Sequence, residues 1–339
     1  MKIIFIPLLI IFLAACQQTQ SPPEQTAKKV EEKSLIELGG EKQYVEITGS
    51  SDKNPVLLFM HGGPGWPETP QLRYFSADLT KDFTVVAWDQ RGAGKSFMAN
   101  PAPKNMTLDQ ITTDAHELTQ LLKTKFGQKK IYLAGYSWGS IIGMHLVQKY
   151  PDDYLAYIGI GQVINMKRGI AVAQEWLAKQ AQAKGDQETL NALAKLKHPT
   201  KDFCAGDLAC FLKQYESVMK YGAAIHNKEA DKENEIAINK YEDYKGYDWN
   251  KGFEFSAKNL ERDMFAADFD KVRELKIPVY FFLGRHDWNV PAVLVEEFAN
   301  KLTAPKKEII WFENSAHSPI EEEPKYFNQM MVEKVLRGK

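Results

Sequence analysis

The stretch KIYLAGYSWGSIIGMHLVQKY, residues 130–150, decides how this chain of 339 residues folds. Its centre, GYSWG at residues 135–139, fits the pattern G-x-S-x-G, with an apolar run before it and an apolar run of helical spacing after it. Glycines suit the two flanking positions because side chains there would collide with the neighbouring strand and helix. The stretch predicts a strand, a strained turn and a helix, with Ser137 held out to react. The alternative is an ordinary turn between a strand and a helix.

The same alternation extends on both sides of this stretch. β-branched and aromatic residues form continuously apolar runs, which are typical of strands buried on both faces, at residues 55–60, 83–89, 130–135, 154–161, 278–284 and 307–313. Helical patterns lie between and after them, at residues 108–126, 138–150, 293–302 and 324–336. Strands alternating with helices predict an α/β fold with a mostly parallel sheet covered on both faces.

The alternation stops in the middle of the chain. Residues 163–267 are rich in Lys, Glu, Asp, Gln and Ala, with aromatic residues spaced through them, and show helical patterns without strands. We therefore expect one α/β core formed by residues 35–162 and 268–339, with residues 163–267 inserted as a helical cap.

A nucleophilic serine needs a base, and the base needs an acid that orients it. Asp287 follows the apolar run 278–284, and His317, the one histidine after it in the chain, follows the run 307–313. The order serine, acid, histidine is the one expected for a G-x-S-x-G turn, and all three residues fall at carboxyl ends of strands. The sequence predicts a triad of Ser137, Asp287 and His317, although a helix-capping carboxylate and a surface histidine are the alternatives.

An acyl-transfer site also needs N–H donors for the oxyanion. The backbone N–H of Trp138, directly after the nucleophile, is one candidate. The loop HGGPG, residues 61–65, follows an earlier strand and allows close backbone approach, so Gly63 is the second candidate and Gly62 the next. We expect His61 to brace this loop rather than to react. A plain Gly/Pro turn is the alternative for this loop.

The segment DQRGAGKS, residues 89–96, resembles a phosphate-binding loop only superficially. A P-loop needs glycine five positions before Gly94, and that position is Asp89. We therefore expect no nucleotide, and we expect Asp89 and Arg91 to form a structural ion pair or to brace a loop.

The N-terminus has the character of an export signal. Lys2 precedes an apolar run that is shorter than a membrane span, and Leu13-Ala14-Ala15 stands before Cys16. This pattern resembles a bacterial lipobox, so we expect residues 1–15 to be a lipoprotein signal peptide and Cys16 to be acylated; an uncleaved anchor or a plain signal peptide is the alternative. Residues 16–34 are polar and indicate a flexible tether. The expected location is the bacterial cell envelope, on the periplasmic or cell-surface face.

The remaining cysteines, Cys204 and Cys210, fit either a disulfide or two free thiols. Export favours a disulfide, but six residues of one straight helix rise about 9 Å, so a bridge requires a turn near Gly206. Formal net charge is −1 and no basic block is present, which argues against nucleic acid as a partner. We expect a small peptide or ester as substrate, and no cofactor or metal.

The motifs HGGPG, DQRGAGKS, GYSWGS, GRHD and SAHSP occur in this order between residues 56 and 319. Together they resemble the α/β-hydrolase family that includes prolyl iminopeptidase, which removes an N-terminal proline from peptides. The resemblance implies an α/β-hydrolase core with a helical cap and no metal. In that family, cap glutamates bind the free amine of the substrate. Here several cap glutamates are present, but none matches the family pattern by position: Glu175, Glu216, Glu235, Glu242 and Glu254.

Two departures from the family concern the substrate pocket. GIGQVIN, residues 159–165, replaces the usual LRG, and the bulky pair Trp66-Pro67 follows HGGPG where small residues are usual. The predicted function is therefore a serine hydrolase, with an aminopeptidase that releases N-terminal proline or another small residue as the first reading. A carboxylesterase or lipase-like hydrolase is the alternative, and an inactive lipid-anchored binding protein is the third.

Overall fold

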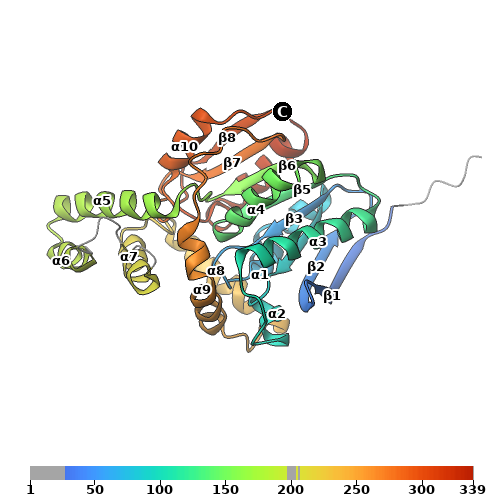
Figure 1. Cartoon of the computed structure of the whole chain (residues 1–339), viewed down its shortest axis with the longest axis horizontal. Helices are drawn as coiled ribbons and strands as arrows, with labels where there is room; N and C mark the ends of the chain where they lie inside the picture. The colour runs from blue at the N-terminus through green and yellow to red at the C-terminus, as the bar shows by residue number, and fades with distance from the viewer. Residues whose placement is uncertain (1–26, 197–203, 205–206, 339) are drawn as a thin grey trace, which may run out of the picture.

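The computed structural model describes residues 27–196, 204 and 207–338, and its centre is one sheet of eight strands. Figure 1 shows the sheet running through the molecule with helices packed on it. The strand order is β1-β2-β4-β3-β5-β6-β7-β8; β1 and β2 run antiparallel to their neighbours and the other pairs are parallel. The strands are β1 (Val30–Leu38), β2 (Glu41–Gly49), β3 (Val56–Met60), β4 (Thr84–Asp89), β5 (Ile131–Tyr136), β6 (Tyr154–Ile160), β7 (Val279–Gly284) and β8 (Lys307–Phe312).

Helices cover both faces of the sheet, which confirms the predicted α/β class. On one face, α3 (Leu108–Phe126), α4 (Trp138–Lys149) and α10 (Ala292–Lys301) bury apolar side chains against one set of strand residues. The opposite set packs against α1 (Thr69–Phe75) and α12 (Pro324–Met330). β3, β4 and β7 are buried at every position, so their sequences do not alternate between apolar and polar residues; only the two end residues of β4, Thr84 and Asp89, are polar.

The chain enters the sheet earlier than the sequence indicated. The predicted tether reaches residue 34, but β1 already begins at Val30, which is buried at one end of the strand. Between its buried ends, β1 is mostly exposed and polar, so its sequence looks like a tether. Pairing with β2 over its whole length, from Val30 opposite Gly49 to Leu38 opposite Glu41, holds it in place. The ordered core therefore includes residues 30–34.

The inserted segment is helical, as its composition indicated. Figure 1 shows α5, α6 and α7 standing away from the sheet, and α8 and α9 closer to it. An antiparallel bridge between Asn165 and Asp268 joins the two ends of the insertion. The helices are α5 (Met166–Lys184), α6 (Gln187–Leu196), α7 (Leu208–Lys220), α8 (Lys228–Lys240) and α9 (Trp249–Ala266).

Short helical elements complete the described chain. They are η1 (Ala77–Lys81), α2 (Gly94–Ala99), η2 (Pro151–Asp153), η3 (Glu242–Tyr244), α11 (Pro319–Glu322) and η4 (Met331–Leu336). The helix predicted over 324–336 is thus α12 followed by the π-helical turn η4. None of the helices in the described residues is long and apolar enough to cross a membrane. The proposed signal peptide and Cys16 lie outside the described residues.

Candidate active site

Ser137 occupies the turn between β5 and α4, as the opening stretch indicated. Its backbone has φ 51° and ψ −115°, a conformation that is strained for a residue with a side chain. Its N–H donates to the carbonyl of Ile160, at the end of β6, at 2.9 Å. The fold therefore holds Ser137 at the carboxyl edge of the sheet in a conformation that the surrounding structure must support.

The two glycines of the motif are required by space. A Cβ at Gly135 would lie 2.5 Å from the carbonyl oxygen of Gly139. A Cβ at Gly139 would lie 2.2 Å from the carbonyl oxygen of Met60, the last residue of β3. Both distances are far below contact distance, so only glycine permits β5, α4 and β3 to approach this closely around Ser137.

His317 and Asp287 meet at the same edge, although 30 residues separate them. Asp287 follows β7, His317 follows β8, and Nδ1 of His317 lies 2.8 Å from Oδ2 of Asp287. Both side chains are buried, and Oδ1 of Asp287 accepts a hydrogen bond from the N–H of Val290 at 2.8 Å. A carboxylate on Nδ1 fixes the ring so that Nε2 is free to act as a base.

Nε2 of His317 is buried and has no hydrogen-bond partner among the described residues. The His317 ring lies against the end of β6, which also anchors Ser137, since a Cβ at Gly161 would be 2.7 Å from its Cε1. Ser137, Asp287 and His317 thus lie after the carboxyl ends of β5, β7 and β8. His286, next to Asp287, does not belong to this group. It stacks on His226 from the cap with ring centroids 3.6 Å apart.

Glu322 fastens the histidine loop to the cap. Its carboxylate accepts hydrogen bonds from the N–H groups of Ala316 at 2.8 Å, His226 at 2.7 Å and Asn227 at 2.9 Å. Burial raises the pKa of this carboxyl, although the backbone donors oppose that rise. Glu322 therefore positions the residue before His317 and the start of α8 together.

The cap also reaches the site through its main chain. The carbonyl of Ala223 accepts from the N–H of Trp288 at 2.9 Å, and that of Ala224 accepts from the N–H of His317 at 3.0 Å. Trp288 in turn stacks on Trp176 of α5, with ring centroids 4.9 Å apart. These contacts attach the cap directly to His317 and to the residue that follows Asp287.

The loop predicted to hold the oxyanion is braced by His61. Its Nδ1 donates to the carbonyl of Gly62 at 2.8 Å, and its Nε2 accepts from the N–H of Gln90 at 3.0 Å. Burial lowers the pKa of His61 to about 4, so the ring is neutral near pH 7. The Gln90 side chain links this loop to α4, because it donates to the His61 carbonyl at 3.0 Å and accepts from Nε1 of Trp138 at 3.1 Å.

Both candidate glycines belong to the loop that lies against the nucleophile turn. A Cβ at Gly62 would be 3.3 Å from Cβ of Ser137, and Gly63 has φ +101°. Trp138 is the first residue of α4, so its N–H has no acceptor within the helix and is available to a ligand. The assignment of Gly63 and Trp138 as oxyanion donors stays a prediction.

Asp89 and Arg91 do not pair with each other, which corrects one of the two expectations for them. Arg91 bonds instead to Asp114 of α3, with Nε 2.9 Å from Oδ2. Asp89 accepts from the Thr69 hydroxyl at 2.7 Å and from the Tyr244 hydroxyl of the cap at 2.6 Å. Asp89 and Arg91 therefore each hold a loop in place through other partners, which is the second of the two expectations.

The cap glutamates singled out from the sequence are all exposed: Glu175, Glu216, Glu235, Glu242 and Glu254. Cys204 and Cys210 are joined in a disulfide with Cα atoms 5.3 Å apart. Within the described part of the chain, His, Cys, Asp and Glu side chains do not gather in groups of three or more that could hold a metal ion.

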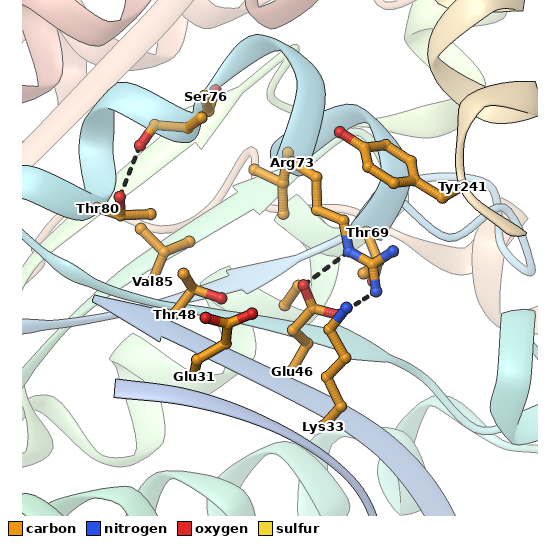
Figure 2. A pocket seen from close by; sticks show the side chains of 13 residues that line it. Glu31, Lys33, Glu46, Thr48, Thr69, Arg73, Ser76, Thr80, Val85 and Tyr241 are labelled. Atoms are coloured by element: carbon orange, nitrogen blue, oxygen red, sulfur yellow. Dashed lines mark hydrogen bonds and ion pairs between the residues drawn. The ribbon is translucent and has the colours of Figure 1, made fainter. Parts of the chain in front are cut away.

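A separate cavity of about 300 Å³ lies between α1, the β1–β2 hairpin and the cap residue Tyr241. Figure 2 shows Arg73 crossing it to Glu46. Arg73 also pairs with Asp243 of the cap, which holds the pKa of that carboxyl well below its usual range. Because the guanidinium group of Arg73 is already paired with the carboxylates of Glu46 and Asp243, we assign no ligand to this cavity.

The order of the strands in the sheet and the inserted helices are typical of one class of hydrolase. The profile of the α/β-hydrolase fold family matches residues 55–324, and the chain belongs to that family. A probable aminopeptidase, YbaC, from Bacillus subtilis (strain 168) is 33% identical over 302 residues, which cover 86% of this chain and 92% of that protein. The proline iminopeptidase of Neisseria gonorrhoeae is 36% identical over 110 residues, which cover 32% of this chain and 33% of that enzyme. The chain is thus an enzyme with aminopeptidase homologues.

Solved structures share the fold over nearly the whole chain. The proline iminopeptidase-related protein TTHA1809 from Thermus thermophilus superposes with a TM-score of 0.66 at 20% identity, covering 91% of this chain and 98% of that one. A thermophilic esterase from Thermogutta terrifontis gives a TM-score of 0.59 at 16% identity, covering 91% and 98%. At these identities the superpositions establish the fold.

Sequence reasoning missed two residues that support the site. Gln90 and Glu322 act through contacts with distant segments, and a motif does not reveal such contacts. Glu322 lies in the run EEE, residues 321–323, which reads as a solvated charge cluster. The one feature of the sequence that could have indicated a role for Glu322 is its position shortly after the candidate histidine His317.

Proposed function

We propose that this enzyme is a serine aminopeptidase that releases N-terminal proline or another small residue from peptides. The observation that carries the proposal is the buried His317–Asp287 pair, whose free Nε2 lies at the sheet edge where Ser137 adopts its strained turn. The homologue named probable aminopeptidase spans most of both chains and supports the choice of an amide substrate.

In the proposed reaction, Oγ of Ser137 attacks the carbonyl carbon of the first residue while Nε2 of His317 takes the hydroxyl proton. Asp287 holds the tautomer with Nδ1 protonated and stabilises the imidazolium that forms. The N–H groups of Trp138 and Gly63 stabilise the oxyanion. His317 then gives the proton to the leaving amine, and water, deprotonated by the same ring, releases the acyl group and restores Ser137.

Initial rates on a small panel of substrates test this proposal. The full chain in mild detergent is assayed on proline p-nitroanilide, its N-acetylated form, alanine p-nitroanilide and p-nitrophenyl butyrate. Cleavage of the free amines but not of the acetylated amide is expected. Hydrolysis of the ester alone, without regard to an amine, would identify a carboxylesterase instead. A lack of Ser137 labelling by a fluorophosphonate probe would contradict any serine hydrolase.

We also propose that the enzyme is a lipoprotein of the bacterial cell envelope, anchored through Cys16 and facing the periplasm or the cell surface. The support is the Leu-Ala-Ala-Cys pattern after a short apolar run. Cys16→Ser should leave the expressed chain unacylated, as measured by mass spectrometry of the N-terminal peptide and by release from washed membranes. A wild-type N-terminal peptide without the mass of an acyl group, or unchanged membrane retention of Cys16→Ser, would contradict this anchor.

A further inference from the structure

Tyr136, the residue before the candidate nucleophile, carries a buried hydroxyl that has no place in the reaction above. Tyr136 is the last residue of β5 and is 7% exposed. Its hydroxyl shares a hydrogen bond of 2.6 Å with Oγ of Ser318, a buried residue that directly follows the candidate base His317. The bond therefore joins the neighbour of the nucleophile to the neighbour of the base, although 182 positions separate them in the chain.

The ring of Tyr136 packs near two loops of the site. Its centroid lies 5.2 Å from that of His317, and the two ring planes are inclined at 37°. The HGGPG loop is also close, because a Cβ at Gly62 would lie 3.2 Å from Cδ1 of Tyr136. These contacts limit the positions that the ring can adopt, and they aim its hydroxyl at Ser318.

Ser318 uses its hydroxyl for this bond and not for the role that its position favours. Ser318 is the N-cap residue of α11, where a serine side chain commonly accepts from a backbone N–H of the first helical turn. Among the described residues its side chain makes no such capping bond. Burial raises the pKa of the Tyr136 hydroxyl well above its usual value, so this hydroxyl keeps its proton near neutral pH. Both groups are therefore committed to each other.

The candidate base makes no hydrogen bond to the nucleophile in this structure. Nε2 of His317 is buried and has no partner within the described residues. A catalytic hydrogen bond that is absent without substrate forms in the complex with substrate, provided that the two loops hold the groups close enough. What sets the spacing of these loops therefore sets how readily His317 takes the proton of Ser137.

One hydrogen bond links the two loops directly. Of the bonds made by the described residues, the one between Tyr136 and Ser318 joins the nucleophile turn, residues 136–138, to the loop of the base, residues 314–318. The backbone N–H groups of the nucleophile and the base donate to other segments, β6 and the cap. The spacing of the turn and the loop thus depends on this pair of side chains.

We propose that Tyr136 and Ser318 are positioning residues, whose hydrogen bond holds the turn and the loop at the spacing from which Nε2 of His317 reaches Oγ of Ser137. This inference rests on the proposed serine hydrolase chemistry and deepens it, whether the substrate is an amide or an ester. Neither residue is assigned a contact with substrate. Loss of the bond should therefore slow the proton transfer and leave substrate affinity unchanged.

Removal of either hydroxyl tests the pair. Tyr136→Phe keeps the ring, Ser318→Ala keeps the backbone of the loop, and near-ultraviolet circular dichroism confirms folding of the full chain. Two quantities are measured: kcat and KM on the best substrate of the panel, and the rate constant with which a fluorophosphonate probe labels Ser137. Tyr154→Phe is the matched control, because buried Tyr154 begins β6 at the amino edge of the sheet and its hydroxyl bonds Oγ1 of Thr119 at 3.2 Å.

We expect kcat and the labelling rate constant to fall about tenfold or more in Tyr136→Phe and in Ser318→Ala, since a displacement of about 1 Å is enough for such a loss. KM should stay within about twofold of wild type, as should all rates of Tyr154→Phe. The double variant should lose no more than the weaker single variant, because both changes break one bond. The inference is overturned if either single variant keeps the wild-type kcat, if its loss lies in KM, if the two losses multiply in the double variant, or if Tyr154→Phe loses as much.

The two proposals fail in different ways. If the wild type cleaves proline p-nitroanilide and Tyr136→Phe and Ser318→Ala match its rates, the aminopeptidase stands and the positioning pair is wrong. If the wild type hydrolyses only the ester while both variants lose kcat and labelling rate, the positioning pair stands and the peptidase assignment is wrong. A wild type that is neither labelled nor active on any substrate of the panel overturns both.

Discussion

The core and the cap of this enzyme differ in whether their glutamates are buried or exposed. The glutamates of the cap that drew attention in the sequence all lie in solvent, whereas Glu68, Glu321 and Glu322 of the core are buried around the candidate site. An exposed carboxylate keeps its hydration and does not lower the stability of the fold. Burial of a carboxylate costs free energy, so a buried one is expected to have a hydrogen-bonding or charged partner, or a role in function. The abundance of acidic residues in the cap is therefore a poor guide to where the chemistry lies.

The cap contributes to the site in a different manner. Its carbonyls at Ala223 and Ala224 accept from the backbone of the core, and its Trp176 stacks on Trp288. These contacts hold the cap against the sheet edge that carries the triad candidates. We therefore expect substitutions of core polar residues to change catalysis, and substitutions of cap glutamates to leave it nearly unchanged.

The largest difference between the two regions is expected at Ser137. Ser137→Ala removes the nucleophile and should lower kcat by up to about 10⁶-fold, because the members of a triad act as a unit. Rates on the best substrate of the panel, with active enzyme counted by fluorophosphonate labelling of the wild type, provide the measurement. The cap variant Glu254→Gln is the control and should remain within about twofold of wild type, since that side chain lies in solvent. Turnover near the wild-type rate in Ser137→Ala would contradict the assignment.

A smaller but still large loss is expected at Asp287. Asp287→Asn keeps an oxygen for the N–H of Val290 but favours the wrong tautomer of His317, and a fall in kcat of about 10⁴-fold is expected. Glu216→Gln, on the exposed face of α7, serves as the comparison from the cap. Stopped-flow or steady-state rates above pH 7 measure the effect. A loss below about tenfold would mean that Asp287 does not orient the base.

The sequence predicted what is encoded locally. Each triad candidate follows its own strand, so the order of the motifs is enough to place Ser137, Asp287 and His317 at one edge of the sheet. The strands from β3 to β8 were predicted because continuous apolar runs indicate burial on both faces. The hairpin β1–β2 was missed because β1 exposes most of its side chains and resembles a polar linker.

What the sequence did not predict depends on contacts between distant segments. The partner of Arg91 is Asp114, on a helix 23 residues further along the chain, and proximity in sequence to Asp89 pointed the wrong way. The burial of Glu68 close to α11 likewise arises only when the ends of β3 and β8 are folded onto one edge. No local pattern of charge or periodicity encodes such an encounter.

A moderate effect is expected at Glu322, which joins the core to the cap. Glu322→Gln keeps the size of the side chain but weakens its bonds to the N–H groups of Ala316, His226 and Asn227, because hydrogen bonds to a charged acceptor are stronger. We expect kcat to fall about tenfold with little change in KM, since His317 loses its fixed position rather than the substrate its contacts. Glu242→Gln in the cap is the control. A change confined to KM would assign Glu322 to substrate binding instead.

The smallest effect concerns stability and its dependence on pH. The pKa of Glu68 is raised from 4.5 to about 8, so between these values the folded enzyme holds a proton that the unfolded chain has lost. Stability then falls as pH rises through this window, by at most about 1.36 kcal/mol for each pH unit, so the loss across it is on the order of a few kcal/mol. Glu68→Gln removes this titration, so its unfolding free energy should vary less with pH and should exceed that of wild type at the upper end of the window. Urea unfolding followed by tryptophan fluorescence at several pH values measures both quantities, and Glu254→Gln should keep the wild-type slope because that carboxyl lies in solvent. If Glu68→Gln also keeps the wild-type slope, Glu68 is ionised in the folded enzyme near neutral pH, and the contrast between buried core and exposed cap carboxylates loses its energetic basis at this position.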